Sequence, residues 1–181
     1  YYSFGAKPNT KTDGCLAALF QLEITYTDGT TETLGSSDRA EWTLGPAIAD
    51  LWAGEKYDAS IELKDWTSSD PSRKWAPVKV MKYGYDNLVP QNQDRVRAIA
   101  QLPVKQILQS PKGECILDFG QNMAGIVQMR TSLKAGQTIR LEHCEVLDKD
   151  GNYFNNILNT TGVSLGIDQT DEYISSGRPS G

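Results

Sequence analysis

Apolar and polar residues alternate along much of the chain, which is the pattern of β-strands with one apolar face. The clearest run is residues 18–26, where every second position is apolar. The pair Asp28-Gly29 separates this run from residues 30–34, and a DG pair between two such runs predicts a β-hairpin. Further short strands are predicted over residues 41–44, 60–63, 78–83, 96–101, 104–109, 114–119, 126–133, 138–147 and 170–174.

No amphipathic helix of useful length emerges between these runs. Many short strands separated by turns predict an all-β fold, an antiparallel β-sandwich of jelly-roll type. The alternative is two sandwiches in series, the second of them incomplete. The turn-forming residues 109–113 mark the expected joint. We therefore expect one β-sandwich domain over residues 1–109 and the start of a second, truncated β-sandwich domain over residues 110–181.

Size and charge narrow the possible functions. A chain of 181 residues can bury one good core or two small ones. The net charge of -5 comes from mixed acids and bases with no basic cluster, which argues against a nucleic-acid partner. No apolar run approaches the roughly 18 residues that a membrane-spanning helix needs. The first residues lack the form of a signal peptide, so the sequence leaves the cellular compartment open.

The spacing of the cysteines and the histidine argues against a metal site and against a nucleophilic active site. The cysteines, Cys15, Cys115 and Cys144, form no CxxC pair, so we expect small buried residues rather than a disulfide framework or zinc site. The only histidine, His143, adjoins Cys144 in a strand pattern that does not suit a nucleophile and its base. No cofactor is expected.

Residues 148–152, Asp-Lys-Asp-Gly-Asn, resemble a calcium loop because oxygen-bearing side chains alternate. An EF-hand loop starting at Asp148 would need glycine at its sixth position, where Tyr153 stands, and glutamate at its twelfth, where Asn159 stands. A tight turn that ends the preceding strand is the better interpretation, and no metal site is expected.

Five motifs occur in an order that resembles a known family. They are the hairpin at residues 16–34, WAGEKYDA at 52–59, WAPV at 75–78, DFGQNMAG at 118–125 and HCEVLDKDG at 143–151. Each alone is weak, but together they are similar to the non-catalytic β-region that precedes the catalytic barrel of bacterial α-L-rhamnosidases, a glycoside hydrolase family. Ser60 departs from that pattern, since arginine is usual there.

The resemblance implies an inverting exo-glycosidase that releases terminal α-L-rhamnose, with its acid and base carboxylates on an (α/α)6 barrel. No position of this chain matches those carboxylates, so we assign no catalytic residue and expect no activity from the chain alone. The expected role is that of an accessory structural domain, whose partner is the catalytic barrel of the same polypeptide. The implied source is bacterial, and the compartment could be cytoplasmic, periplasmic or secreted.

The alternative function is a carbohydrate-binding module for rhamnose-containing glycans. Aromatic rings stack on sugars and carboxylates accept their hydroxyl hydrogen bonds. The candidates are Trp52, Tyr57, Asp58, Trp66 and Trp75, although tryptophan and tyrosine are also ordinary residues between sheets.

A separate set of residues is expected to help dock the β-region against its neighbour in the polypeptide. Gln121 and Asn122 lie in the glycine-bounded turn at residues 120–125, and His143 and Glu145 share one face of a predicted strand.

Overall fold

The computed structural model describes residues 17–50, 54–63, 67, 75–82, 84–86, 88–155 and 169–178. They belong to two compact units. The first unit lies within Tyr1–Gly45 and Leu63–Pro90, and the second within Pro46–Glu62 and Gln91–Gly181. The expected boundary near residue 110 stays a prediction.

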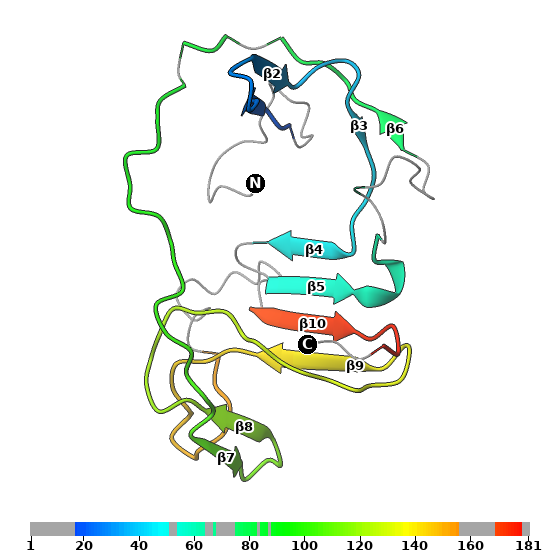
Figure 1. Cartoon of the computed structure of the whole chain (residues 1–181). Helices are drawn as coiled ribbons and strands as arrows, with labels where there is room; N and C mark the ends of the chain where they lie inside the picture. Colours follow the sequence, from blue (N-terminus) through cyan, green and yellow to red (C-terminus); the bar gives the residue numbers. More distant parts are fainter. Residues whose placement is uncertain are drawn as a thin grey trace. The chain divides into compact units, whose positions relative to one another are not determined.

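The described residues are all-β, which confirms the predicted fold class, and most of their strand pairs are antiparallel (Figure 1). The strands are β1 (Gln21–Thr25), β2 (Thr31–Gly35), β3 (Glu41–Trp42), β4 (Ala47–Asp50), β5 (Gly54–Asp58), β6 (Ala76–Pro77), β7 (Gln106–Gln109), β8 (Cys115–Asp118), β9 (Thr138–Glu142) and β10 (Thr170–Ile174), with one 3-10 turn, η1 (Ala59–Ile61). Within this part of the chain, no helix has the length and apolar character to cross a membrane.

The first unit contains the predicted DG hairpin. Strands β1 and β2 pair antiparallel, with Thr25 opposite Thr31. Gly29 adopts φ +86, which favours glycine, and its N–H donates to the Tyr26 carbonyl at 3.0 Å. Asp28 Oδ1 accepts from the Thr30 N–H at 2.9 Å and so fixes the turn. The short strands β3 and β6 form a second antiparallel pair in this unit.

The second unit is built on a four-stranded sheet of order β4-β5-β10-β9, together with the β7–β8 hairpin (Figure 1). Strand β10 pairs antiparallel with β9 but parallel with β5, where Tyr173 lies opposite Tyr57. The parallel pair departs from the uniformly antiparallel expectation. It joins strands that are far apart in sequence, and no local pattern specifies such a pairing.

Gly54 makes the close approach of β5 to β10 possible. Its φ is +96, and a Cβ atom on it would lie 2.2 Å from the Thr170 carbonyl oxygen. Any other residue would therefore be strained in its backbone and would also collide with the neighbouring strand.

Buried residues are few in the described part of the chain. Ala59 is its one buried apolar residue, while the buried polar residues are Ser110, Asn152 and Ser175. Ser175 is fully buried, and its Oγ donates to the Leu133 carbonyl at 3.1 Å. Within the described part of the second unit, the fully or nearly buried side chains are therefore mainly polar.

Several predicted strands were wrong or too long. Residues 60–63 do not form a strand, because the Asp58 carboxylate caps η1 by accepting from the Ser60 N–H. Strand β4 and strand β5 were missed, since their short mixed sequences do not alternate. Residues 96–101 alternate in part but belong to no strand, and the predicted strand at residues 126–133 is reduced to a single bridge residue, Thr131.

One cysteine prediction was also wrong. Cys144 is half-buried and free, but Cys115 is exposed in β8 rather than buried. Cys15 lies outside the described residues.

Candidate functional site

The predicted sugar-binding residues do not form one described site. Tyr57 and Asp58 end strand β5 in the second unit, whereas Trp75 precedes β6 in the first. Trp52 and Trp66 lie outside the described residues. Each described candidate can therefore be judged only by its own surroundings.

Tyr57 is engaged by its neighbours in the sheet. Its ring stacks on that of Tyr173, with centroids 6.2 Å apart and planes 11° from parallel. Its hydroxyl donates to Glu62 Oε1 at 3.1 Å. Burial, and then this hydrogen bond to a carboxylate, raise the pKa of Tyr57 above its ordinary value. One ring face thus serves the β5–β10 contact, and the hydroxyl binds Glu62 just after η1, as expected of a structural tyrosine.

Asp58 is also occupied locally. Its Oδ1 accepts from both the N–H and the Oγ of Ser60, at 2.9 and 2.6 Å. These hydrogen bonds hold the pKa of Asp58 below its ordinary value. The carboxylate serves as the cap of η1.

Trp75 presents a different case. The residue is half-buried, and its indole Nε1 is buried with no hydrogen-bond partner among the residues that the structure describes. Buried indole N–H groups ordinarily have a partner, so this donor marks a place where the described contacts are incomplete.

The predicted docking residues Gln121 and Asn122 are both exposed and follow the β8 strand. Just before them, Gly120 takes φ +78, and its N–H donates to Asp118 Oδ1 at 2.6 Å. Hydrogen bonds from Gln106 and from the Gly120 N–H lower the pKa of Asp118. The turn is therefore set by Asp118 and Gly120, which leaves the two amide side chains available at the surface.

His143 pairs with a residue that sequence reasoning missed. Its Nε2 lies 2.9 Å from Asp171 Oδ2, and both side chains are about 40% exposed. Asp171 Oδ1 also accepts from the Glu55 N–H at 3.0 Å. Asp171 thus links β10 to β5 and to the residue that follows β9. Glu145, predicted to act beside His143, is exposed.

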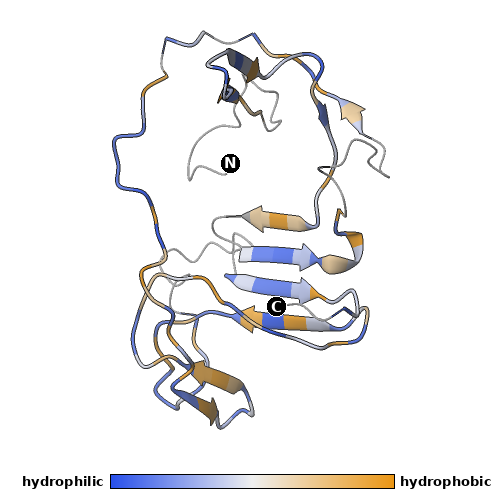
Figure 2. Cartoon of the chain, in the orientation of Figure 1, coloured by the Kyte–Doolittle hydropathy of each residue, from blue (hydrophilic) through white to orange (hydrophobic). Residues whose placement is uncertain are grey.

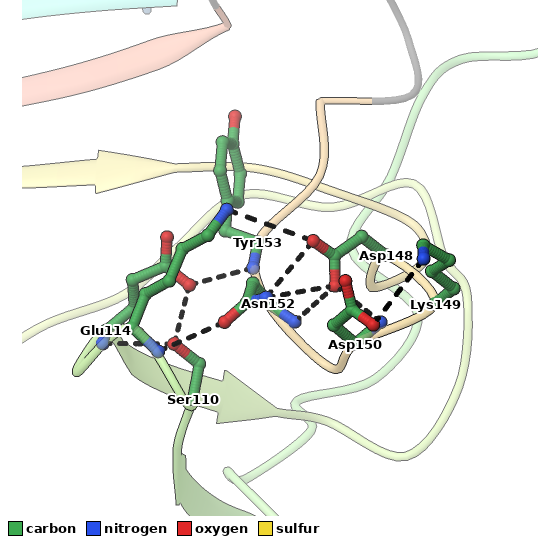
Figure 3. A network of polar contacts seen from close by, with 8 residues as sticks. Ser110, Glu114, Asp148, Lys149, Asp150, Asn152 and Tyr153 are labelled. Carbon is green, nitrogen blue, oxygen red and sulfur yellow. Dashed lines mark hydrogen bonds and ion pairs between the residues drawn. The ribbon is translucent and has the colours of Figure 1, made fainter.

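A polar cluster joins two turns that lie far apart in sequence (Figure 3). We call it the turn latch, formed by Ser110, Glu114, Asp148, Asn152 and Tyr153. Glu114 Oε2 accepts from Ser110 Oγ at 2.7 Å and from the Tyr153 N–H at 2.9 Å. Asn152 Oδ1 accepts from the N–H of Lys112 at 3.1 Å. The latch connects the β7–β8 turn to the turn after β9.

Within the turn latch, Asp148 organises its own turn. Its Oδ1 accepts from the N–H groups of Asp150 and Asn152 at 2.9 and 2.7 Å. The Asn152 Nδ2 reaches both carboxylate oxygens at 3.2 Å (Figure 3). Backbone hydrogen bonding from Asn152 is the main cause that lowers the pKa of Asp148. The predicted tight turn is confirmed, and the carboxylate oxygens are committed to it.

Glu114 is likewise held in its charged form. The hydroxyl of Ser110, followed by the N–H of Tyr153, lowers the pKa of Glu114 below its ordinary value. The latch therefore consists of two carboxylates satisfied by donors, an arrangement that stabilises structure and leaves neither group poised as a general acid.

Among the described residues there is no cluster of three or more histidine, cysteine, aspartate or glutamate side chains that could hold a metal ion. The polar groups that do come together, the turn latch and the His143–Asp171 pair, connect one strand or turn to another. Their geometry is that of structural contacts.

Comparison with known proteins identifies where such a fold occurs. Residues 2–100 match the family described as the α-L-rhamnosidase N-terminal domain, and residues 108–181 match the bacterial α-L-rhamnosidase concanavalin-like domain.

Relatives that match this chain carry the name α-L-rhamnosidase, and two of them illustrate the match. The protein from Streptomyces avermitilis is 38% identical over 169 residues, which is 90% of this chain and 15% of the relative. The protein from Alteromonas sp. is 32% identical over 142 residues, or 76% of this chain and 15% of the relative. The chain thus spans about a seventh of the length of these relatives.

Solved structures also share the fold, among them two α-L-rhamnosidases. The native α-L-rhamnosidase from Aspergillus terreus superposes with a TM-score of 0.78 at 28% identity, covering 88% of this chain and 18% of that one. The α-L-rhamnosidase from Dictyoglumus thermophilum gives a TM-score of 0.73 at 24% identity, covering 89% of this chain and 18% of that one. The chain belongs to the bacterial α-L-rhamnosidase family and corresponds to its non-catalytic N-terminal and concanavalin-like domains.

Proposed function

We propose that this chain is the accessory, structural β-region of a glycoside hydrolase that releases terminal α-L-rhamnose, and that it supports the catalytic barrel of the same polypeptide. The observation that carries the proposal is the match of nearly the whole chain to only 15% of a named α-L-rhamnosidase. In such a protein the rest of the polypeptide is available to hold the catalytic carboxylates.

The polar groups of the described residues support an accessory role. Inverting glycoside hydrolysis needs one carboxylate that is protonated and another that activates water. The two carboxylates at the centre of the turn latch, Glu114 and Asp148, have lowered pKa values because several donors satisfy them. Neither is suited to donate a proton near neutral pH.

The exposed apolar surface is a second observation in favour of a structural role. Among the described residues, one apolar residue is buried, while many large apolar side chains are exposed. A domain that works alone buries most of such surface. A region that supports a larger neighbour would bury it there.

The proposal is tested by removing the region from the complete polypeptide. Residues 1–181 are deleted, and soluble yield, thermal unfolding and hydrolysis of 4-nitrophenyl α-L-rhamnopyranoside are compared with those of the intact protein. We expect the deleted form to lose solubility or to unfold at a lower temperature, with activity falling in parallel. A deleted form as stable and as active as the intact protein would refute the supporting role.

A separate titration distinguishes a carbohydrate-binding module from a scaffold. The complete polypeptide, with its catalytic carboxylates replaced, is titrated with L-rhamnose while tryptophan fluorescence is followed. A scaffold predicts that Trp75→Phe leaves the response unchanged, since its Nε1 is buried rather than presented to solvent. Loss of a saturable response in that variant would favour the sugar-binding alternative.

A further inference from the structure

Two stretches of the second unit run without strand partners. Residues 94–104 and 121–130, which we call the open segments, belong to no strand. Within the described part of the chain, they make no hydrogen bond from backbone to backbone. An extended backbone whose N–H and C=O groups are all unpaired can accept a further strand.

Three apolar side chains of the open segments are almost fully exposed. Val96, Ile99 and Ile126 have relative exposures of 102%, 97% and 96%. Single exposed apolar residues are ordinary, but large β-branched residues at full exposure in two unpaired stretches of one unit indicate a surface that another element covers.

The β7–β8 hairpin connects the two open segments and, like them, exposes apolar side chains. Ile107 lies opposite Leu117 on one of its faces, and the two are 69% and 41% exposed. The hairpin is among the most apolar parts of the second unit in Figure 2. A two-stranded hairpin is marginal by itself and needs further strands or another layer.

A contact between side chains links the open segments to each other. Gln101 Nε2 donates to Gln128 Oε1 at 3.4 Å. Next to the first segment, the Lys105 N–H donates to the Asp118 carbonyl at 2.8 Å and extends the β7–β8 pairing by one residue. The unpaired backbone therefore begins where this pairing stops.

Pairing with a second copy of the same segments is disfavoured by charge. The first open segment carries exposed Arg95 and Arg97, and the second carries exposed Arg130. Self-pairing would bring arginines towards arginines, with Asp94 as the one carboxylate in the two segments.

We propose that the open segments are edges that receive β-strands from the remainder of the same polypeptide, which pair with residues 94–104 and 121–130 and cover Val96, Ile99 and Ile126. This inference rests on the proposed function, because the Streptomyces avermitilis relative has 85% of its length outside the matched region (100 minus the 15% covered). Addition of a strand to an exposed edge is a common mode of recognition.

Hydrogen exchange in the complete polypeptide tests the inference. Successive N–H groups of a strand point to opposite sides, so about every second backbone amide of residues 94–104 and 121–130 is expected to exchange at least ~100-fold more slowly than its intrinsic rate. Pro103 has no N–H and is left out. Residues 91–93, a polar stretch that is also unpaired, serve as the internal control and should exchange near those rates. Intrinsic rates throughout both open segments would overturn the proposal.

A pair of variants in the complete polypeptide locates the protected surface. Ile99→Asp should lower protection of residues 94–104 by about 10-fold or more, with the β9 and β10 amides unchanged. Gln93→Asp introduces the same charge at an exposed polar position and should leave protection unchanged. Equal effects of the two variants would count against burial of Ile99.

Two further readouts separate this inference from its alternatives. Protection that disappears on dilution would identify a second copy as the occupant and overturn the proposal. Hydrolysis of 4-nitrophenyl α-L-rhamnopyranoside is measured on the same sample. Activity without protection rejects the strand-receiving edges but retains the proposed function, whereas protection without activity retains the edges and rejects the function.

Discussion

The turn latch and the open segments lie in the same unit but differ in the burial of their side chains and in their hydrogen bonding. In the turn latch, Asn152 is 3% exposed, and its side chain both donates and accepts hydrogen bonds. In the open segments, Ile99 is 97% exposed, and its backbone has no backbone hydrogen-bond partner among the described residues. The turn latch is thus paired within the described residues, whereas the open segments are the surface that we propose the rest of the polypeptide covers.

The latch and the four-stranded sheet form the self-sufficient part. Here, polar groups are satisfied over sequence separations of 40 residues between Lys112 and Asn152 and 116 residues between Glu55 and Asp171. Contacts of this kind fix the two turns of the latch relative to each other and β5 relative to β10. Substitutions should therefore act strongly in one part and weakly in the other.

The largest expected effect comes from the approach of β5 to β10. Gly54→Ala would place a Cβ atom 2.2 Å from the Thr170 carbonyl oxygen and strain a φ of +96. We expect the local stability of the sheet to fall by about 3 kcal/mol or more, measured by hydrogen exchange of β5 and β10 amides in the complete polypeptide. Gly113→Ala is the matched control, because its φ is +87 but nothing lies within 4 Å of its Cβ position. Equal losses would show that backbone strain alone explains the effect.

A smaller loss is expected in the turn latch. Asn152→Ala removes the acceptor of the Lys112 N–H and the donor to Asp148. Because Asn152 is buried, these groups lose their partner, and the local free energy of opening should fall by about 1–3 kcal/mol. Hydrogen exchange of the Lys112 amide reports the change. Lys149→Ala, at an 89% exposed position in the same turn, should change it by less than about 0.5 kcal/mol.

Substitution of Asp171, which links β5 to β10, should cost less stability than the two changes above. Asp171→Ala removes the carboxylate that accepts from the Glu55 N–H and contacts His143. The expected loss is about 0.5–1.5 kcal/mol, since one backbone donor loses its acceptor at a half-exposed site. Asp171→Asn keeps an acceptor for that N–H and should retain most of the stability. If both variants behave alike, the charge rather than the hydrogen bond to Glu55 matters.

Acid should weaken the turn latch without a mutation. Hydrogen bonds from donors lower the pKa of both Glu114 and Asp148 in the folded protein, so the stability they contribute is present above their unfolded pKa values. That stability is lost as pH falls through the lowered folded values, below about pH 4. Protection factors of the Asn152 and Tyr153 amides, corrected for intrinsic exchange, should decline there. In Glu114→Gln, the protection factors should decline less steeply as the pH falls. An unchanged decline would show that Glu114 does not cause it.

Sequence patterns identified the parts of the fold that depend on neighbours in the chain. The Asp28-Gly29 hairpin and the turn at residues 148–152 were predicted because their hydrogen bonds close within a few residues. Strand β10 was predicted at the same residues, 170–174, that it occupies. The family was also recognisable, since its motifs keep their order along the chain.

Contacts across the chain could not be predicted. The partner of His143 is Asp171, 28 residues away, because the pairing of β9 with β10 brings them together. The parallel pairing of β5 with β10 depends on Gly54, which by itself looks like an ordinary loop glycine. Residues 96–101 and 126–130 alternate as strands do but have no strand partner among the described residues, so strand propensity alone did not produce pairing.

The most direct test of the account is hydrolysis of 4-nitrophenyl α-L-rhamnopyranoside by the complete polypeptide and by this chain alone, at equal molar concentration. The account predicts release of 4-nitrophenol by the complete polypeptide and a rate equal to the buffer blank for the chain. Turnover by the chain alone would contradict its assignment as a non-catalytic region, and an inactive but folded complete polypeptide would contradict the proposed activity.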